Sequence, residues 1–202
     1  MKRFLLSILA AVVCVAASAE FRWGPTAGVN VTSYKYSQDL YAIAPSVGGS
    51  AGVMGELMFP GIGFGIDFGL NYNLHGSKLH LGDKKVWASA GYGVEQSWLH
   101  TIEVPINLRF KYTNLNGIER KIAPFVYGGP LFSIIAGHST LDALKYTGGS
   151  VMLQCGVGAE LFEHLQISAG YYWGMTYETQ TIKLEDLTSR SQGWRVNLTY
   201  LF

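Results

Sequence analysis

Charged residues of both signs stand inside segments that otherwise consist mainly of apolar and small residues. They are Glu56, Asp67, Glu103, Arg109, Glu160 and Arg195. Each shares alternate positions with Gly, Asn, Thr or Gln, opposite the positions of the large apolar residues. A buried charge is costly unless it is paired. We therefore predict that Arg109 and Arg195 each pair with one or more of the four carboxylates. Such pairs could form a structural plug or a switchable gate in a narrow solute path, and the sequence leaves both open.

His75 and Ser77 invite an enzymatic interpretation, because a similar His-x-Ser pair serves in an outer-membrane lipid A deacylase. That chemistry faces lipid, whereas His75 has the parity of Asn71 and Asn73 on the polar face of its segment. The other histidines show no metal-ligand spacing, and the glycines alternate along strands instead of opening a phosphate-binding helix. We therefore expect no enzyme, and no catalytic, cofactor or metal site.

Two-residue periodicity positions these side chains, and it is clearest from Trp98 to Tyr112, where one face is continuously apolar and the other carries charge. Eight such segments cover approximately residues 21–33, 47–59, 62–74, 98–112, 121–136, 151–161, 165–176 and 194–202. The fifth is the least regular. Phe125 and Leu131 suggest one face, while Val126 and Phe132 blur the other. Two prolines, Pro105 and Pro130, fall inside segments and predict β-bulges or a local error in register.

The connections between these segments alternate strictly in length. The short ones are Pro60-Gly61 and residues 114–120 and 162–164, and the long ones cover residues 34–46, 76–96, 137–149 and 178–192. All short connections must therefore lie at one end of the structure. Short periplasmic turns and long extracellular loops are typical of outer-membrane barrels. Both chain ends are then expected on the periplasmic side.

Side-chain volume indicates which face is outside. A soluble eight-stranded barrel with an apolar interior would show the same alternation. The large residues, such as Phe64, Phe68 and Trp194, lie on the apolar faces, whereas glycines crowd the polar faces. An eight-stranded barrel has room inside only for its own side chains, so the small face points inward and the apolar belt points to lipid. We predict an all-β, eight-stranded, antiparallel up-and-down transmembrane β-barrel in the outer membrane, present as a monomer.

The N-terminus is typical of a secretory signal. Lys2 and Arg3 precede an apolar run over residues 4–16, and Ala17-Ser18-Ala19 follows as a cleavage site. We expect residues 1–19 to be removed and residues 20–202 to form the barrel. Val13 before Cys14 argues against a lipid anchor. Loss of two cations changes the formal charge from +1 to −1, which excludes an electrostatic footprint for nucleic acid. Cys155 then stands alone, as a small hydrophobic residue on an apolar face.

The chain resembles the PorT-like, porin-family small outer-membrane barrels of the Bacteroidetes. The residues that carry this resemblance are Ile102-Glu103-Val104-Pro105-Ile106, the segment from Pro124 to Gly129-Pro130, Gly156-x-Gly158-x-Glu160 and the terminal Phe202. Asn107 departs from the apolar residue expected after the first motif. The resemblance implies a barrel in the outer membrane, and it implies that Phe202 is the signal read by the barrel-assembly machinery.

Three functions remain open at this point. The first is a small structural or solute-conducting barrel with a plugged or narrow polar lumen and long extracellular loops. The second, which the resemblance allows, is an accessory component of protein secretion with partners in a secretion complex. The third and least favoured is a lipid-modifying barrel enzyme. The expected partners are outer-membrane lipid and the assembly machinery, with no nucleic acid and no cofactor.

Overall fold

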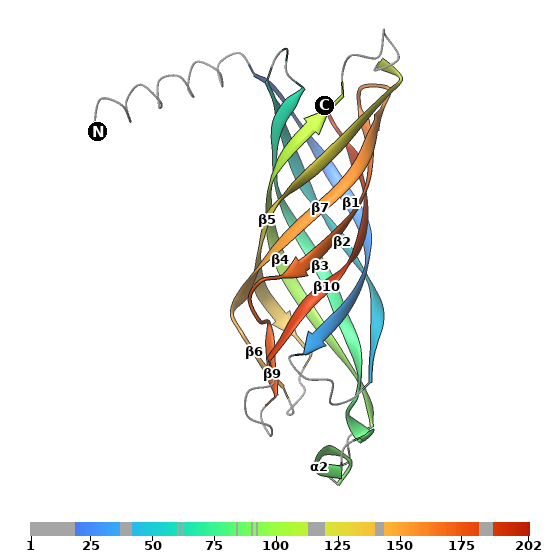
Figure 1. Ribbon diagram of the computed structural model, residues 1–202, viewed down its shortest axis with the longest axis vertical. Helices are drawn as coiled ribbons and strands as arrows, with labels where there is room; N and C mark the ends of the chain where they lie inside the picture. Colours follow the sequence, from blue (N-terminus) through green and yellow to red (C-terminus); the bar gives the residue numbers. More distant parts are fainter. Residues whose placement is uncertain are drawn as a thin grey trace, which may run out of the picture.

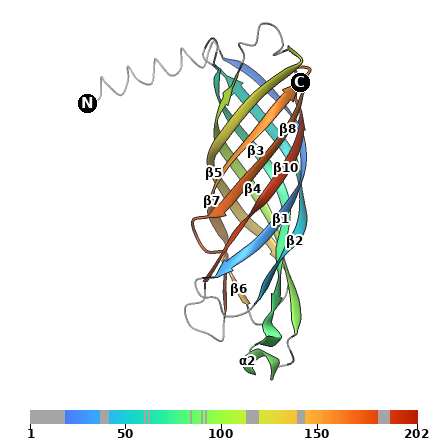
Figure 2. The same cartoon turned by 45° about the vertical axis from the view of Figure 1, so that its right-hand side comes forward.

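Eight long strands form a closed antiparallel barrel in the computed structural model, which describes residues 19–36, 42–59, 61, 63–83, 85–89, 91, 93–112, 120–139, 144–181 and 188–202 (Figure 1). The strands of the wall are β1 (Glu20–Tyr36), β2 (Ile43–Met58), β3 (Phe64–His80), β4 (Val94–Lys111), β5 (Ile122–His138), β7 (Gly149–Leu161), β8 (Leu165–Gly174) and β10 (Thr188–Tyr200). Each pairs with its neighbours along the chain, and β10 pairs with β1 to close the wall (Figure 2). The predicted fold class is confirmed.

Four short elements lie in the longer connections: η1 (Leu81–Asp83), α2 (Lys85–Ala88), β6 (Leu144–Tyr146) and β9 (Thr179–Thr181). None of the helices in the described residues is long and apolar enough to cross a membrane. The end of the barrel with the C-terminus and the turn at residues 162–164 is called the turn end, and the end with α2 is called the loop end (Figure 1). The leader before Ala19 and the short connection at residues 113–119 lie outside the described residues.

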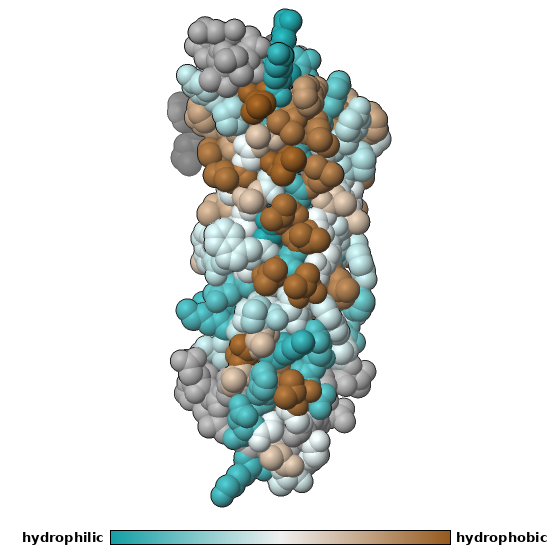
Figure 3. All heavy atoms as spheres, turned by 90° about the vertical axis from the view of Figure 1, so that its right-hand side faces the viewer, coloured by the Kyte–Doolittle hydropathy of each residue, from teal (hydrophilic) through white to brown (hydrophobic). Residues whose placement is uncertain are grey.

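The apolar belt faces outward, as predicted. Phe68 and Leu108 are 43% and 70% exposed, whereas Asp67 and Asn107 on the opposite faces of the same strands are buried. Figure 3 shows hydrophobic side chains gathered over one face of the wall. Cys155 is also exposed on this outer surface, in agreement with its predicted apolar side. The wall therefore has an outer surface suited to lipid and a polar interior.

The structure shows which residues of the fifth predicted strand face the lumen and which face outward. Phe125 and Leu131 are buried inside the barrel, while Val126 and Phe132 point outward. Glycines on β7 and β8 make room for the inward rings of Phe125 and Tyr127, because a Cβ added at Gly158 would collide with the Phe125 ring. The pattern of β5 is blurred because apolar residues occupy both of its faces.

The predicted bulges at Pro105 and Pro130 are wrong. The register of β4 against β3 and β5 is the same on both sides of each proline, and only the ladder pairs beside them are missing. A proline removes one donor, so a local loss of pairing is sufficient to accommodate it. The register shifts occur elsewhere, between Pro45 and Gly49 and between His100 and Thr101.

The strands extend further toward the loop end than predicted, into segments expected to be loops. β1 continues to Tyr36, and β3 continues to His80. The alternation reverses there: Tyr34 and Leu79 are buried inside the barrel, while Lys35 and Lys78 are exposed outside. A strand prediction based on outward apolar residues stops at this reversal, although the backbone pairing continues through it.

Candidate functional site

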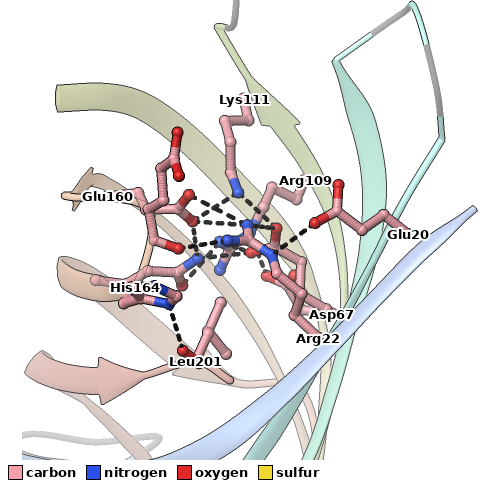
Figure 4. A network of polar contacts seen from close by, with 11 residues as sticks. Glu20, Arg22, Asp67, Arg109, Lys111, Glu160, His164 and Leu201 are labelled. Carbon is pink, nitrogen blue, oxygen red and sulfur yellow. Dashed lines mark hydrogen bonds and ion pairs between the residues drawn. The ribbon is translucent and has the colours of Figure 1, made fainter. Parts of the chain in front are cut away.

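Seven polar residues fill the lumen near the turn end and form what we call the turn-end cluster (Figure 4). They are Arg22, Glu56, Asp67, Arg109, Lys111, Glu160 and Gln166. The carboxylate of Glu56 lies at the centre and is fully buried. It accepts hydrogen bonds from Nη2 of Arg22 at 2.7 Å, Nη1 of Arg109 at 2.7 Å and Nζ of Lys111 at 2.5 Å. One carboxylate therefore connects three cations.

The other two carboxylates complete the cluster. Asp67 accepts a hydrogen bond from Nε of Arg109 at 2.7 Å, and the guanidinium of Arg109 also stands 4.0 Å from the centre of the Phe125 ring. Glu160 forms ion pairs with Lys111 at 2.7 Å and Arg22 at 2.9 Å. Three cations thus face three carboxylates, so the cluster is neutral and its buried charges are paired.

Strand register places these residues at one level of the barrel. Arg22 is the partner of Glu56 across β1 and β2, and Glu56 is the partner of Asp67 across β2 and β3. Arg109 follows two residues along β4 from the partner of Asp67, so it points to the same side. Because every second residue of a strand faces inward, the cluster follows from parity and register alone.

A second ion pair lies further toward the loop end. Nη1 of Arg195 is 2.8 Å from Glu103, and both side chains are buried. Glu103 also accepts a hydrogen bond from Nδ2 of Asn73 at 2.7 Å, and Arg195 stands 5.1 Å from the centre of the Tyr172 ring. This pair is therefore held by an amide and a ring as well as by its own charges.

A small cavity lies in the lumen, lined among others by Asp67, Arg109 and Arg195. Its volume for water-sized contents is about 40 Å³. A single water needs roughly 10–15 Å³ on this measure, so the cavity holds at most a few waters. Around the charged residues the lumen is therefore filled by side chains.

Glu178 forms a third polar group beyond the end of β8, with His75, Ser150 and Ser191. Its carboxylate accepts a hydrogen bond from Oγ of Ser150 at 2.6 Å, another from Ser191, and one from Nε2 of His75 at 3.4 Å. All four residues are buried. Burial raises the pKa of Glu178, but the hydrogen bonds from His75, Ser150 and Ser191 outweigh it, so this pKa lies below its usual range. The group ties the connection after β8 to the inner faces of β3, β7 and β10.

All the predicted lumen residues face the interior, in two groups. Arg109 is paired with Glu56 and Asp67, and Arg195 with Glu103, so the predicted ion pairs are present. Glu160 lies in the turn-end cluster but pairs with other cations. Whether these pairs act as a plug or a gate stays a prediction.

Sequence reasoning omitted three kinds of contributor from the predicted network. Arg22 lies on the polar face of its segment, and this parity was a sufficient signal for it. Lys111 shares the polar face of Arg109 and was expected nearer the periplasmic rim, outside the predicted network. Gln166 has the same parity and bridges Glu56 and Glu160. Glu178 had no such signal. It lies in the connection after a strand, and periodicity does not predict the path of a connection.

The His-x-Ser pair does not form a catalytic arrangement. Ser77 donates to the carbonyl oxygen of Ala44 at 2.9 Å, while His75 contacts Asn73 and Glu178. Both side chains are fully buried inside the barrel, away from the lipid-facing surface. Among the residues that the structure describes, no group of acidic, His and Cys side chains could hold a metal ion.

The comparison with protein families decides the identity of this barrel. Residues 16–180 match the family described as outer membrane protein beta-barrel domain. The chain belongs to this family. As a member of the outer membrane protein beta-barrel family it is located in the outer membrane, and its apolar belt meets the hydrocarbon of that bilayer.

One solved structure shows the same fold at low sequence identity, and two others are similar to the chain. The outer membrane protein OprG from Pseudomonas aeruginosa is 12% identical, with a TM-score of 0.54 over 92% of this chain and 96% of that one. Ail, the attachment invasion locus protein of Yersinia pestis, is 12% identical, with a TM-score of 0.45 over 91% of this chain and 99% of that one. Neisserial surface protein A is 12% identical, with a TM-score of 0.43 over 89% and 97%. No curated protein matches the chain.

The last residue of this family member lies at the turn end. Phe202 is 64% exposed, and its ring lies 5.8 Å from that of Trp23 and 5.3 Å from that of Tyr200, between centres. Its backbone N–H donates to the carbonyl oxygen of Trp23 at 2.9 Å. The terminal ring is thus part of an outward aromatic group. Recognition of Phe202 by the barrel-assembly machinery stays a prediction.

Proposed function

We propose that this protein is a monomeric, non-conducting outer-membrane barrel with a structural role, whose lumen is closed by the turn-end cluster. The observation that carries the proposal is the set of ion pairs that join Arg22, Arg109 and Lys111 to three carboxylates across the lumen. The pairs span strands from β1 to β7, so they cross-link the wall as well as fill it.

The energetics favour a plug over a gate. Separating one partner of a buried pair leaves an uncompensated charge and costs roughly 3–5 kcal/mol. Opening a path past Glu56 would require several such separations together, because three cations bind this one carboxylate. A gate would need a stimulus of comparable size.

Single-channel recording tests this proposal. We expect the purified, refolded barrel to give no discrete conductance steps in a planar lipid bilayer, since its charged lumen is filled. An open porin incorporated in the same way serves as the positive control. Reproducible steps from the wild-type barrel, at a fraction of insertions comparable to the porin, would contradict the proposed closed lumen.

The orientation of the barrel has its own test. With Cys155→Ala as background, we expect Asp83→Cys at the loop end to react with a membrane-impermeant thiol reagent on whole cells. Lys121→Cys at the turn end should react only after the outer membrane is permeabilised. Both positions are exposed, so reagent access differs only by the side of the membrane. Labelling of Lys121→Cys on intact cells would reverse the orientation.

The accessory role in protein secretion stays a prediction from the resemblance to PorT-like barrels. Isolation of native complexes from the outer membrane would test it, with a stoichiometric secretion partner as the expected finding. Lipid hydrolysis is not favoured, because His75 and Ser77 are buried inside the barrel and bond to other groups.

A further inference from the structure

Two cations lie directly opposite each other on the outer surface near the loop end. Lys35 on β1 is the register partner of Arg190 on β10, and both side chains are exposed. In the described part of the chain neither takes part in an ion pair, whereas Arg22, Arg109, Lys111 and Arg195 all do. Like charges directly opposite in a sheet are destabilising. An anion bound between the two would remove this repulsion.

The space between these cations has the size and chemistry of an anion site. Lys35, Arg190, Tyr36 and Thr188 line a hollow with a volume of about 330 Å³. A guanidinium and an ammonium together suit the oxygens of a phosphate group, since the first offers a fork of donors and the second a compact charge. The volume is also in the range of sites that hold small ligands.

The position of the hollow relative to the membrane indicates which phosphate it meets. Toward the loop end, the outward register pairs of β1 and β10 are, in order, Val31 with Trp194, Ser33 with Gln192, and Lys35 with Arg190. This surface changes from apolar to polar to basic over four residues of each strand, or about 13 Å. With a strand tilt of roughly 40°, this corresponds to about 10 Å along the membrane normal.

This height is at the outer edge of the lipid headgroup layer. Tryptophan marks the boundary of the hydrocarbon, and the headgroup layer adds roughly 5–8 Å on each side of it. Trp194 is 63% exposed and lies at the base of this series. The long side chains of Lys35 and Arg190 can reach back into the headgroup layer, as cations near a membrane interface commonly do.

We propose that Lys35 and Arg190 bind a phosphate group of an outer-leaflet glycolipid against the side of the barrel. The proposal rests on the orientation given above, with the loop end outside, and it deepens the proposed structural role by naming a lipid contact. It does not depend on whether the lumen conducts.

The test compares three proteins by native mass spectrometry in detergent micelles, with diphosphorylated lipid A as the probe. The first is wild type, the second is the double variant Lys35→Gln with Arg190→Gln, and the third is the control Lys78→Gln. Lys78 is also an exposed cation near the loop end, but its register partners, Ala44 and Gln96, are neutral. We expect lipid A binding to fall about twenty-five-fold in the double variant, roughly fivefold for each cation, and to change little in the control.

Two further arms identify the source of the phosphate. Dephosphorylated lipid A should bind wild type no better than it binds the double variant. Inorganic phosphate at millimolar concentration should compete only weakly, because the lipid adds contacts with the apolar wall below the site. Equal binding of lipid A by wild type and double variant would overturn the proposal. Full displacement by inorganic phosphate would overturn the lipid as its ligand.

A stability measurement separates the site from a general effect of the substitutions. In lipid-free detergent the double variant should unfold at the same temperature as wild type or higher, because a like-charge pair has been removed. Addition of diphosphorylated lipid A should raise the unfolding temperature of wild type and Lys78→Gln only. A lower unfolding temperature of the double variant without lipid would show that the two residues serve folding instead, and would contradict the proposal. The conductance recordings described above are independent of this result.

Discussion

Replacement of Arg109 by alanine is expected to lower the free energy of unfolding by about 3–5 kcal/mol, the range for a broken buried ion pair. Arg109 binds Glu56 and Asp67, each at 2.7 Å. Its loss leaves the carboxylate of Asp67 without its ion-pair partner in a buried position. Reversible urea unfolding of the barrel in liposomes measures the change.

Two further variants distinguish a buried pair from a general loss of packing. Arg120→Ala removes an exposed arginine that lies 4.0 Å from Glu163, and it should change stability little. Asp67→Asn combined with Arg109→Ala should recover part of the loss, because the isolated carboxylate is then neutral. If the double variant were no more stable than Arg109→Ala, the charge of Asp67 would not be the cause. Conductance should stay near zero in Arg109→Ala if the cluster is a plug, and should rise if it is a gate.

Placing an arginine at Val104 is expected to cost about 2–4 kcal/mol, because the new cation would face lipid near the middle of the membrane. Val104 belongs to the outward-facing residues of β4, between Ile102 and Ile106, which are 39% and 43% exposed. Folding into liposomes, followed by urea titration, gives the difference from wild type.

The matched control for this change is Asn107→Ser on the opposite face of the same strand. Asn107 accepts a hydrogen bond from Nε2 of Gln154 at 2.9 Å in the lumen, and the loss of one such bond costs about 1 kcal/mol. Val104→Arg should therefore be clearly the more destabilising of the two. Equal costs, or the reverse order, would mean that the lipid-facing and lumen-facing sides have been exchanged.

The sequence predicts the fold well where one rule holds along a whole strand. In β3 and β4, large apolar residues alternate with Gly, Asn and charged residues, and both facing and pairing follow from that alternation. Ion pairs such as Arg109 with Asp67 could be predicted because parity sends both residues inward and leaves them no water. The choice of partner could not, since it depends on the register between strands, which the alternation alone does not give.

Other features depend on information that periodicity does not contain. β5 carries apolar residues on both faces, because Gly156 and Gly158 of β7 and Gly170 of β8 leave room for its rings. Glu178 lies outside the strands, so its return to His75 is a property of the folded connection. The prolines were misread because the structure tolerates a local gap in hydrogen bonding and needs no extra residue at that point.

The reversal of the alternation near the loop end means that one continuous wall is stabilised by two different solvents. In the belt, lipid accepts the outward apolar residues, and folding gains from closure of the backbone hydrogen bonds away from water. Beyond the belt, apolar side chains are buried in the interior of the barrel and shielded from water, as in the core of a soluble protein. They are Tyr34, Leu79 and Leu99. This part acquires its core only once it has crossed the bilayer, because its outward lysines would otherwise face hydrocarbon. The belt and the loop end of the same barrel therefore owe their stability to different forces.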